Sequence, residues 1–234
     1  MTVGDRPAFA DFHTHTRFSR DSLLQEDRLI DLAIERGLTH LAVTNHNNVE
    51  GAREVARRVA ERGLGHRLRI IVGEEVSSAD GEIVGLFLET TVPRGLSAEE
   101  TVAEIRAQGG LVSVPHPFDP FRRSHIREAA LERLAEAGLI DALEVFNSRV
   151  TFARHNLHAA EFAARHAIPG IAASDTHTAM EVGMSSNRMP AFSTAAELKA
   201  ALPDNQWQGS RSSMLIHLGT RWAVLSKALS RRPT

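Results

Sequence analysis

The chain has 234 residues, of which 42% are apolar and 24% are charged, and its formal net charge at pH 7 is -2. These values are ordinary for a globular protein with one sizeable core, and so small a charge gives no general attraction to nucleic acid or to an anionic membrane. Cysteine is absent, which excludes disulfides and thiolate metal sites. The first residues lack a signal-peptide pattern, and no apolar run approaches membrane-spanning length. We therefore expect one domain over residues 1–234, located in the cytoplasm, with no membrane contact and no obligate protein partner.

Short apolar segments alternate with longer amphipathic segments from the N-terminus onward. The strand-like segments, in chain order, are Phe9–Phe12, Leu41–Thr44, Arg69–Gly73, Ile83–Leu88, Leu111–Val114, Ala142–Phe146 and Ile171–Ala173. The helix-like segments are Leu23–Arg36, Ala52–Arg62, Ala98–Ala107, Ile126–Ala137 and Phe152–His166. Strands that alternate with helices are typical of parallel βαβ units. This number of units in a chain of this length predicts a compact α/β barrel rather than an open sheet.

Two local patterns refine this outline. The segment Ile83–Leu88 follows the turn signal "VSSADGE" and interrupts the alternation, so we expect it to form a hairpin with the preceding strand. Ser97 followed by Glu100 predicts a capping box at the start of the third helix.

The stretch "AFADFHTHTRFSRDS" places His13 and His15 directly after the first predicted strand. Alternate residues of a strand point to the same face, so these two imidazoles are expected to point to one place. Imidazole is the commonest protein ligand for metal ions. Two satisfied surface histidines are the alternative interpretation of this fragment alone.

Similar side chains follow one predicted strand after another. With the hairpin strand set aside, they are His13 and His15, His46, Glu74 and Glu75, His116, Asn147 and Arg149, and Asp175 and His177. The carboxyl ends of parallel barrel strands meet at one mouth, where such folds keep their active sites. Imidazole and carboxylate without sulfur suit zinc, manganese or iron(II). Together with Asp21, the candidate ligands exceed the three or four that one catalytic zinc ion uses, which favours more than one ion.

The other histidines lie away from the predicted strand ends and are interpreted as background: His40, His66, His125, His155, His158, His166 and His217. From Asn205 onward the chain has no acidic residue but carries Arg211, Arg221, Lys227, Arg231 and Arg232. A solvated basic terminus is the simpler interpretation. An electropositive rim for a phosphorylated substrate is the alternative.

The ordered set "DFHTHT…SRDS…AVTNHN…GEEVSS…PHPFDP…EVFNSR…SDTH" resembles the PHP (polymerase and histidinol phosphatase) family of metal-dependent phosphoesterases. The resemblance implies a distorted seven-stranded (β/α)7 TIM-like barrel. It also implies two or three divalent metal ions, zinc, manganese or iron, at the barrel mouth.

The resemblance further implies which residues hold these ions. By position, the first ion takes His13, His15, Glu75 and Asp175, the second takes the bridging Glu75 and His116, and the third takes Asp21, His46 and His177. Glu75 rather than Glu74 occupies the acidic position of the family's "G-x-E" pattern, and Glu74 is then expected on the opposite strand face.

Three positions depart from the family pattern. Asn45 stands where the family usually has an aspartate that orients the ligands, although its amide oxygen can still accept a hydrogen bond. Asp21 replaces a histidine of some relatives, and Asn147 replaces a histidine that some relatives use at the second ion. The second site is therefore expected to lack one protein ligand.

These features predict hydrolysis of a phosphate ester by hydroxide generated at the metal ions. Arg122 and Arg149 follow the fourth and fifth predicted parallel strands and, with Asn147, are candidate substrate-binding residues, because guanidinium fits phosphate oxygens. The chain has few aromatic residues on which bases could stack. A small phosphorylated metabolite or nucleotide is therefore the preferred substrate, with the end of a short oligonucleotide as an alternative.

Two other functions stay open. Amidohydrolases also use an H-x-H pattern in a barrel, but their two-metal members commonly bridge the ions with a carboxylated lysine, and Lys199 and Lys227 lie in late helical segments. A PHP-like module that binds a ligand without catalysis is the second alternative, because Asn45 and Asn147 depart from the family pattern.

Overall fold

The structure is a computed structural model that describes residues 6–122, 124–213 and 216–230. Nine strands form one sheet in the order β7-β6-β5-β4-β3-β2-β1-β8-β9. Their bounds are β1 Ala8–Asp11, β2 His40–Val43, β3 Arg69–Ser78, β4 Gly81–Leu86, β5 Leu111–Val114, β6 Ala142–Asn147, β7 Gly170–Ala173, β8 Ser185–Met189 and β9 Gln206–Gly209.

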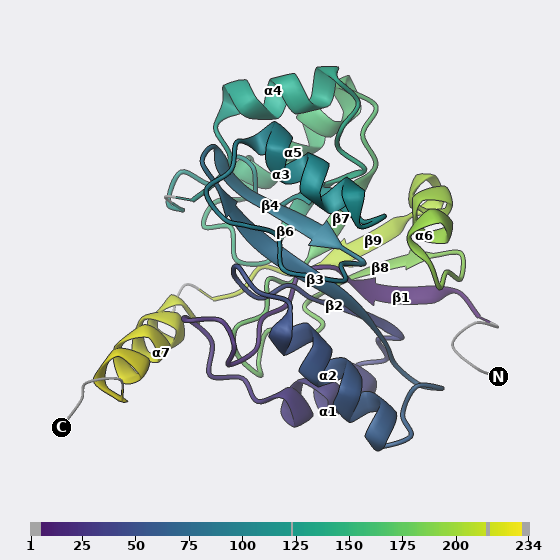
Figure 1. The fold of residues 1–234 in the computed structure, drawn as a ribbon, viewed down its shortest axis with the longest axis vertical. Helices are drawn as coiled ribbons and strands as arrows, with labels where there is room; N and C mark the ends of the chain where they lie inside the picture. Colours follow the sequence, from purple (N-terminus) through teal and green to yellow (C-terminus); the bar gives the residue numbers. More distant parts are fainter. Residues whose placement is uncertain (1–5, 123, 214–215, 231–234) are drawn as a thin grey trace.

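Helices cover this sheet on more than one side (Figure 1). Their bounds are α1 Glu26–Glu35, α2 Glu50–Glu61, α3 Ala98–Ala107, α4 Glu128–Glu136, α5 Ala153–Arg165, α6 Ala195–Ala201 and α7 Ile216–Ser230, with the 3-10 helix η2 at Leu202–Asp204. Figure 1 shows α3, α4 and α5 grouped on one side, α1 and α2 on another, and α7 extending away from both groups. None of the described helices is long and apolar enough to cross a membrane.

The strands curve into a nearly closed barrel. Parallel pairing joins β1, β2 and β3 and, separately, β5, β6 and β7, whereas β4 is antiparallel to both β3 and β5. β8 pairs antiparallel with β1 and with β9. The sequence therefore predicted the α/β barrel and the β3–β4 hairpin correctly, but it predicted seven strands where the structure has nine.

A side chain rather than a strand pair joins β8 to β7. The amide of Asn187 accepts a hydrogen bond from the Ala172 amide at 2.9 Å and donates to the carbonyl oxygens of Ala172 at 2.7 Å and Ala10 at 3.1 Å. It thus replaces backbone pairing at the seam of the barrel, where buried backbone groups need partners.

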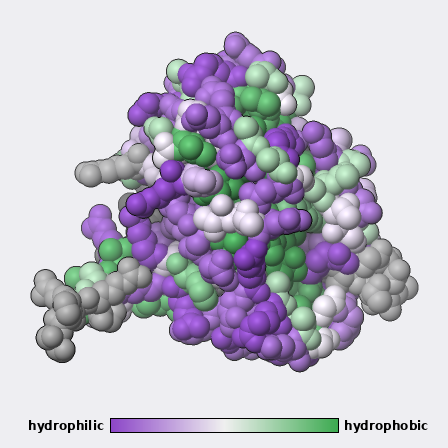
Figure 2. All heavy atoms as spheres, viewed as in Figure 1, coloured by the Kyte–Doolittle hydropathy of each residue, from purple (hydrophilic) through white to green (hydrophobic). Residues whose placement is uncertain are grey.

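Three apolar clusters hold the layers together. One packs α3, α4 and α5 against the sheet around Ile105, Leu131 and Phe162, and another packs α1 and α2 around Leu29 and Val55. The outer faces of α1 and α2 are joined by ion pairs such as Arg62 with Asp31. Figure 2 shows the strongly hydrophilic surface that covers these two helices.

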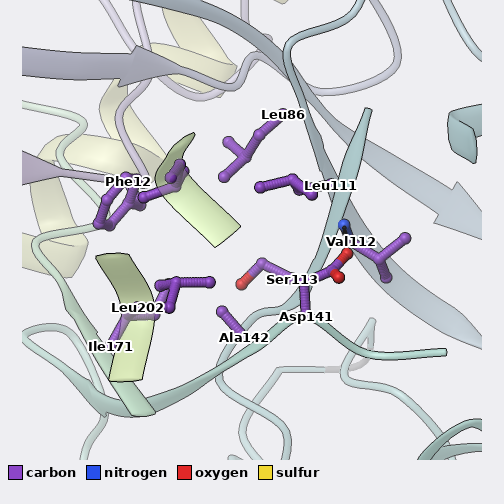
Figure 3. A pocket seen from close by; sticks show the side chains of 10 residues that line it. Phe12, Leu86, Leu111, Val112, Ser113, Asp141, Ala142, Ile171 and Leu202 are labelled. Carbon is purple, nitrogen blue, oxygen red and sulfur yellow. Dashed lines mark hydrogen bonds between the residues drawn. The ribbon is translucent and has the colours of Figure 1, made fainter. Parts of the chain in front are cut away.

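The third cluster fills the amino-terminal end of the barrel, where Leu111 and Ile171 from the starts of β5 and β7 meet Leu198 and Leu202. Only a small cavity of ≈ 10 Å³ remains there, lined mostly by apolar side chains (Figure 3). Because apolar side chains fill this end, the candidate site of histidines and carboxylates lies at the opposite end of the barrel.

Candidate metal centre

The predicted ligands converge at the carboxyl ends of the parallel strands. His13 and His15 follow β1, His46 follows β2, His116 follows β5, and Asp175 and His177 follow β7, while Glu75 lies in the second half of β3. A backbone hydrogen bond from His15 to Thr176 at 2.8 Å draws the ends of β1 and β7 together. The structure therefore brings these side chains together at one mouth of the barrel.

Four of these side chains surround one point. The Nε2 atoms of His13 and His15 are 3.0 Å apart, and each lies 3.3 Å from Glu75 Oε2. Asp175 Oδ1 lies 3.8 Å from His13 Nε2 and 3.6 Å from His15 Nε2. Ligand atoms that sit about 2.1 Å from a tetrahedral ion are about 3.4 Å from one another, so this spacing fits a zinc-sized ion.

Two carboxylate oxygens give a second indication that these residues suit a cation. Glu75 Oε2 and Asp175 Oδ1 are buried and have no hydrogen-bond partner among the described residues. Burying a carboxylate oxygen without a partner is costly. Both atoms face the His13 and His15 imidazoles, so a bound cation would satisfy them.

A second group lies at the more exposed side of the mouth. Asp21 Oδ2 is 3.2 Å from His177 Nε2 and 3.3 Å from His46 Nε2. The imidazoles of His15, His46 and His177 are near enough to one another to hold one ion. The side chains of Asp21 and His46 are 15% and 16% exposed, whereas His13 and His15 are fully buried, so solvent reaches the cluster from this side.

His116 and Glu75 form a third group together with His13. The Nε2 atom of His116 lies 3.2 Å from Glu75 Oε1. His116 and Asp175 both have a positive φ, 29° and 54°, which non-glycine residues rarely adopt. Backbone strain of this kind is typical of functional sites, where it directs a side chain to a fixed place.

Hydrogen bonds on the outer side of the cluster orient the imidazoles. His13 Nδ1 donates to Glu144 Oε1 at 2.7 Å, which leaves Nε2 free to bind an ion. His15 Nδ1 donates to Ser19 Oγ at 3.0 Å, and Ser19 in turn donates to Asn45 Oδ1 at 2.9 Å. The amide oxygen of Asn45 therefore accepts a hydrogen bond, as the sequence predicted.

Charges within the cluster shift several pKa values. Burial raises the pKa of a carboxyl group, but His13 and His46 beside Glu75 outweigh it and hold the pKa of Glu75 well below its usual value. Burial and the nearby His177 lower the pKa of His15 to about 3, so this imidazole is neutral at pH 7. An ionised carboxylate and a neutral imidazole are the forms that bind metal.

The three predicted substrate-binding residues have unequal positions. Arg122 forms an ion pair with Asp175 Oδ2 at the edge of the cluster. Arg149 is buried, with Nε 3.3 Å from Glu181 Oε1, and its Nη2 donates to Thr220 Oγ1 at 2.5 Å. Asn147 donates to Glu144 Oε2 at 2.8 Å and to Asp175 Oδ2 at 3.2 Å. Arg122 and Asn147 thus contact the ligand shell, whereas Arg149 is held by the protein.

Glu74 and Glu75 point in different directions, as the sequence predicted. Glu74 Oε2 accepts a hydrogen bond from the Val92 amide at 2.8 Å, away from the histidines. Two other carboxylates at the cluster were missed. Glu144 lies inside β6, and Glu82 lies on the hairpin strand β4, which interrupts the alternation of strands and helices. In the sequence, each of these two glutamates is a charged residue inside an otherwise apolar strand segment, and that pattern could have indicated them.

The structure is therefore an α/β barrel whose mouth gathers histidines and carboxylates that could hold metal ions. The family model described as PHP domain matches residues 11–164, and the one described as PHP-associated matches residues 153–206. The chain therefore belongs to the PHP domain family, as the sequence predicted.

Two curated proteins and a solved structure are similar to this chain. The uncharacterized protein MJ1587 of Methanocaldococcus jannaschii is 35% identical over 59% of this chain and 81% of that protein. The uncharacterized protein MJ0417 of the same organism is 30% identical over 83% of this chain and 73% of that protein. A two-domain protein of Bacteroides vulgatus, which contains a predicted PHP-like metal-dependent phosphoesterase, has a similar fold, with a TM-score of 0.70 at 18% identity. That match covers 89% of this chain and 66% of the two-domain protein.

Proposed function

We propose that the chain is a metal-dependent phosphoesterase that hydrolyses a small phosphorylated metabolite, a nucleotide or an oligonucleotide end. The observation that carries this proposal is the spacing of His13, His15, Glu75 and Asp175 around one point. Zinc, manganese and iron(II) all accept this ligand set.

The remaining ligands are assigned from the same geometry. Glu75 and His116 border a second position, and Asp21, His46 and His177 border a third. Divalent ions held there would lower the pKa of a water molecule and neutralise charge on the phosphoryl oxygens.

The chain's own residues prepare the site for such a substrate. Glu144 and Ser19 fix His13 and His15 in the orientation that leaves both Nε2 atoms free. Arg122 forms an ion pair with Asp175 Oδ2, and Asn147 donates a hydrogen bond to the same oxygen. Asp175 Oδ1 then faces the histidines. These residues position ligands before a substrate arrives, which limits reorganisation during the reaction.

The substrate is expected to approach beside Asp21. A hollow of ≈ 330 Å³ opens there, lined by Arg20, Asp21, Thr220, Arg221 and Val224. Arg20 and Arg221 give this side of the mouth two guanidinium groups, which fit phosphate oxygens. Arg221 belongs to the basic C-terminal segment, so this hollow supports the electropositive-rim interpretation; Arg231 and Arg232 lie outside the described residues.

The lysine-bridged amidohydrolase alternative gains no support from the two lysines. Lys199 Nζ is 2.9 Å from Asp141 Oδ1, at the other end of the barrel. Lys227 Nζ donates to the backbone carbonyls of Arg17, Ser19 and Ser22, which uses the three donors of an ammonium group.

The test is a substrate screen on protein reconstituted with manganese, zinc or iron. Phosphomonoesters, phosphodiesters, lactones and amides are assayed side by side, with His15→Ala as a control that removes one ligand. We expect turnover of at least one phosphoester and a loss of more than about 100-fold in His15→Ala, since even the loss of an outer-shell partner can cost that much. Metal-loaded, folded protein that cleaves only lactones or amides, or nothing, would contradict the proposal.

A further inference from the structure

A carboxylate of the hairpin strand completes one side of the cluster. Glu82 lies in β4, which pairs antiparallel with β3 so that Glu75 is opposite Val84 and Ser77 is opposite Glu82. Side chains opposite one another share a face, and alternate residues of a strand do so too. Glu82 and Glu75 therefore point into the same side of the barrel, and Glu82 is only 5% exposed.

The two carboxylates stand between the same two imidazoles. Glu82 Oε1 is 3.7 Å from His46 Nδ1, and Glu82 Oε2 is 3.8 Å from His116 Nε2. The corresponding distances from Glu75 are 3.0 Å to His46 Nδ1 and 3.2 Å to His116 Nε2. These separations lie near the roughly 3.4 Å expected between atoms that bind one ion. His46, Glu75 and Glu82 are near enough to one another to hold a metal ion.

Asn147 does not supply a ligand of its own to the position beside His116. Its amide nitrogen donates to Glu144 and Asp175, and its amide oxygen accepts a hydrogen bond from the Arg149 amide at 2.9 Å. Asn147 therefore turns its amide nitrogen, which cannot bind a metal ion, toward Glu144 and Asp175.

We infer that Glu82 is a metal ligand, the third protein ligand of the ion held by Glu75 and His116. Ser124 Oγ donates to Glu82 Oε2 at 2.7 Å and fixes this oxygen 3.8 Å from His116 Nε2, while a second lone pair of Oε2 stays available to the ion. The hairpin strand, which breaks the βα alternation, thereby contributes to the metal centre. This inference rests on the metal cluster of the proposed function and not on the identity of the substrate.

The experiment measures metal content and affinity rather than activity. The full chain is stripped of metal with a chelator and reloaded with manganese or zinc. Elemental mass spectrometry gives the number of bound ions per chain, and chelator competition gives the affinity. The variant is Glu82→Gln, and Glu74→Gln is the matched control. Glu74 is also a buried glutamate of the same hairpin, but it hydrogen-bonds Val92 and faces away from the histidines.

We expect the wild-type chain and Glu74→Gln to bind the same number of ions. Glu82→Gln should bind one ion fewer, or bind that ion at least 10-fold more weakly, which is the lower end of the effect of losing an outer-shell partner. Glu82→Asp keeps the carboxylate on a side chain one methylene shorter and should weaken the binding of the same ion. This variant tests the inference if Glu82→Gln does not fold.

Equal ion number and affinity in Glu82→Gln and Glu74→Gln, or in Glu82→Asp and the wild type, would overturn the inference. Because the wild-type chain is loaded in the same experiment, failure of the metal centre itself is seen separately: a wild type that binds no ion overturns the proposed function as well.

Discussion

At the scale of single residues, Glu144 decides which nitrogen of His13 is available to a metal. Its Oε1 accepts from His13 Nδ1, while its Oε2 accepts from the His116 amide at 3.0 Å and from Asn147. A carboxylate is the only side chain that can accept at both oxygens without offering a proton. When His13 is neutral, as it must be to bind a metal ion, Glu144 therefore favours the tautomer whose Nε2 carries a lone pair.

Glu144→Gln should weaken metal binding by about 10- to 100-fold, the usual effect of losing an outer-shell partner. Its amide oxygen would have to face the His116 amide, so its NH2 group would face His13 Nδ1 and favour the tautomer with hydrogen on Nε2. Chelator competition measures the affinity, and circular dichroism checks that the variant folds. Glu161→Gln on the exposed face of α5 is the control. Equal affinities in the two variants would contradict this role.

His40 makes a different contribution, to stability. Its imidazole is fully buried at the start of β2, with Nε2 2.9 Å from the Phe192 carbonyl oxygen and Nδ1 2.9 Å from Thr39 Oγ1. Burial lowers the pKa of His40 from 6.5 to about 4. From the sequence, His40 is interpreted as a histidine outside the metal site. Its position away from the metal cluster agrees with that interpretation.

Acidification should therefore destabilise the protein partly through His40. Between pH 6.5 and 4 the unfolded chain binds a proton that the folded chain does not, so the free energy of unfolding falls as the pH falls. The difference amounts to about 3 kcal/mol for a shift of this size. Urea titrations at several pH values should show a smaller acid loss in His40→Gln than in the wild type. His66→Gln, which changes an exposed histidine, should follow the wild type; an identical slope in all three proteins would count against this explanation.

Six of the clustered ligand candidates could be placed from the sequence because each follows a strand, whereas Asp21 and Glu75 were assigned by the family resemblance and lie in a loop and inside β3. Glu82 and Glu144 were missed, since residues inside strands can face either the barrel interior or the helices, and only strand register distinguishes the two. The close approach of Arg149 to Glu181 depends on contacts between distant segments, which a local pattern does not contain.

At the scale of secondary-structure elements, the predicted helices and strands agree with the structure to within a few residues, apart from the longer β3. The third helix begins and ends where predicted, and Ser97 and Glu100 form the capping box. The strands β8 and β9 were not predicted because "SSNRM" and "QWQG" lack apolar alternation. Their pairing comes from the barrel seam, where Asn187 supplies hydrogen bonds that a sequence pattern does not reveal.

Asn187→Ala should destabilise the fold by about 2–4 kcal/mol, because it leaves buried backbone groups of Ala172 and Ala10 without partners. Urea denaturation followed by circular dichroism measures the change. The control is Arg188→Ala, which removes an exposed side chain of the same strand and should cost about 0.5 kcal/mol or less. Should both variants lose equally little stability, the seam would be held by other contacts.

At the scale of the whole molecule, the metal cluster joins segments that are distant in sequence. Its side chains come from the ends of β1, β2, β5 and β7 and from β3. Ions that bind only the folded chain stabilise it, by about 4 kcal/mol when their concentration is 1,000 times the dissociation constant.

Removal of metal by a chelator should therefore lower the Tm by about 10 °C, the shift that such an energy gives in a protein of this size. Scanning calorimetry measures the Tm before stripping, after stripping and after reloading with manganese or zinc. His15→Ala should lose much of this dependence, whereas His66→Ala should keep it. A Tm that is the same with and without metal would show that the ions do not contribute to holding the barrel together.

The contact of Lys227 with the loop between β1 and α1 links the far end of the chain to this mouth. Its ammonium group lies on the carbonyls of Arg17, Ser19 and Ser22, and the same loop carries the hydroxyl that orients His15 and the carboxylate of Asp21. Helix α7 thus contacts the loop that carries Ser19 and Asp21. A fused tag, a proteolytic cut ahead of α7 or a bound protein that displaced this helix would remove the contact, and we expect it to weaken the proposed third metal position without unfolding the barrel.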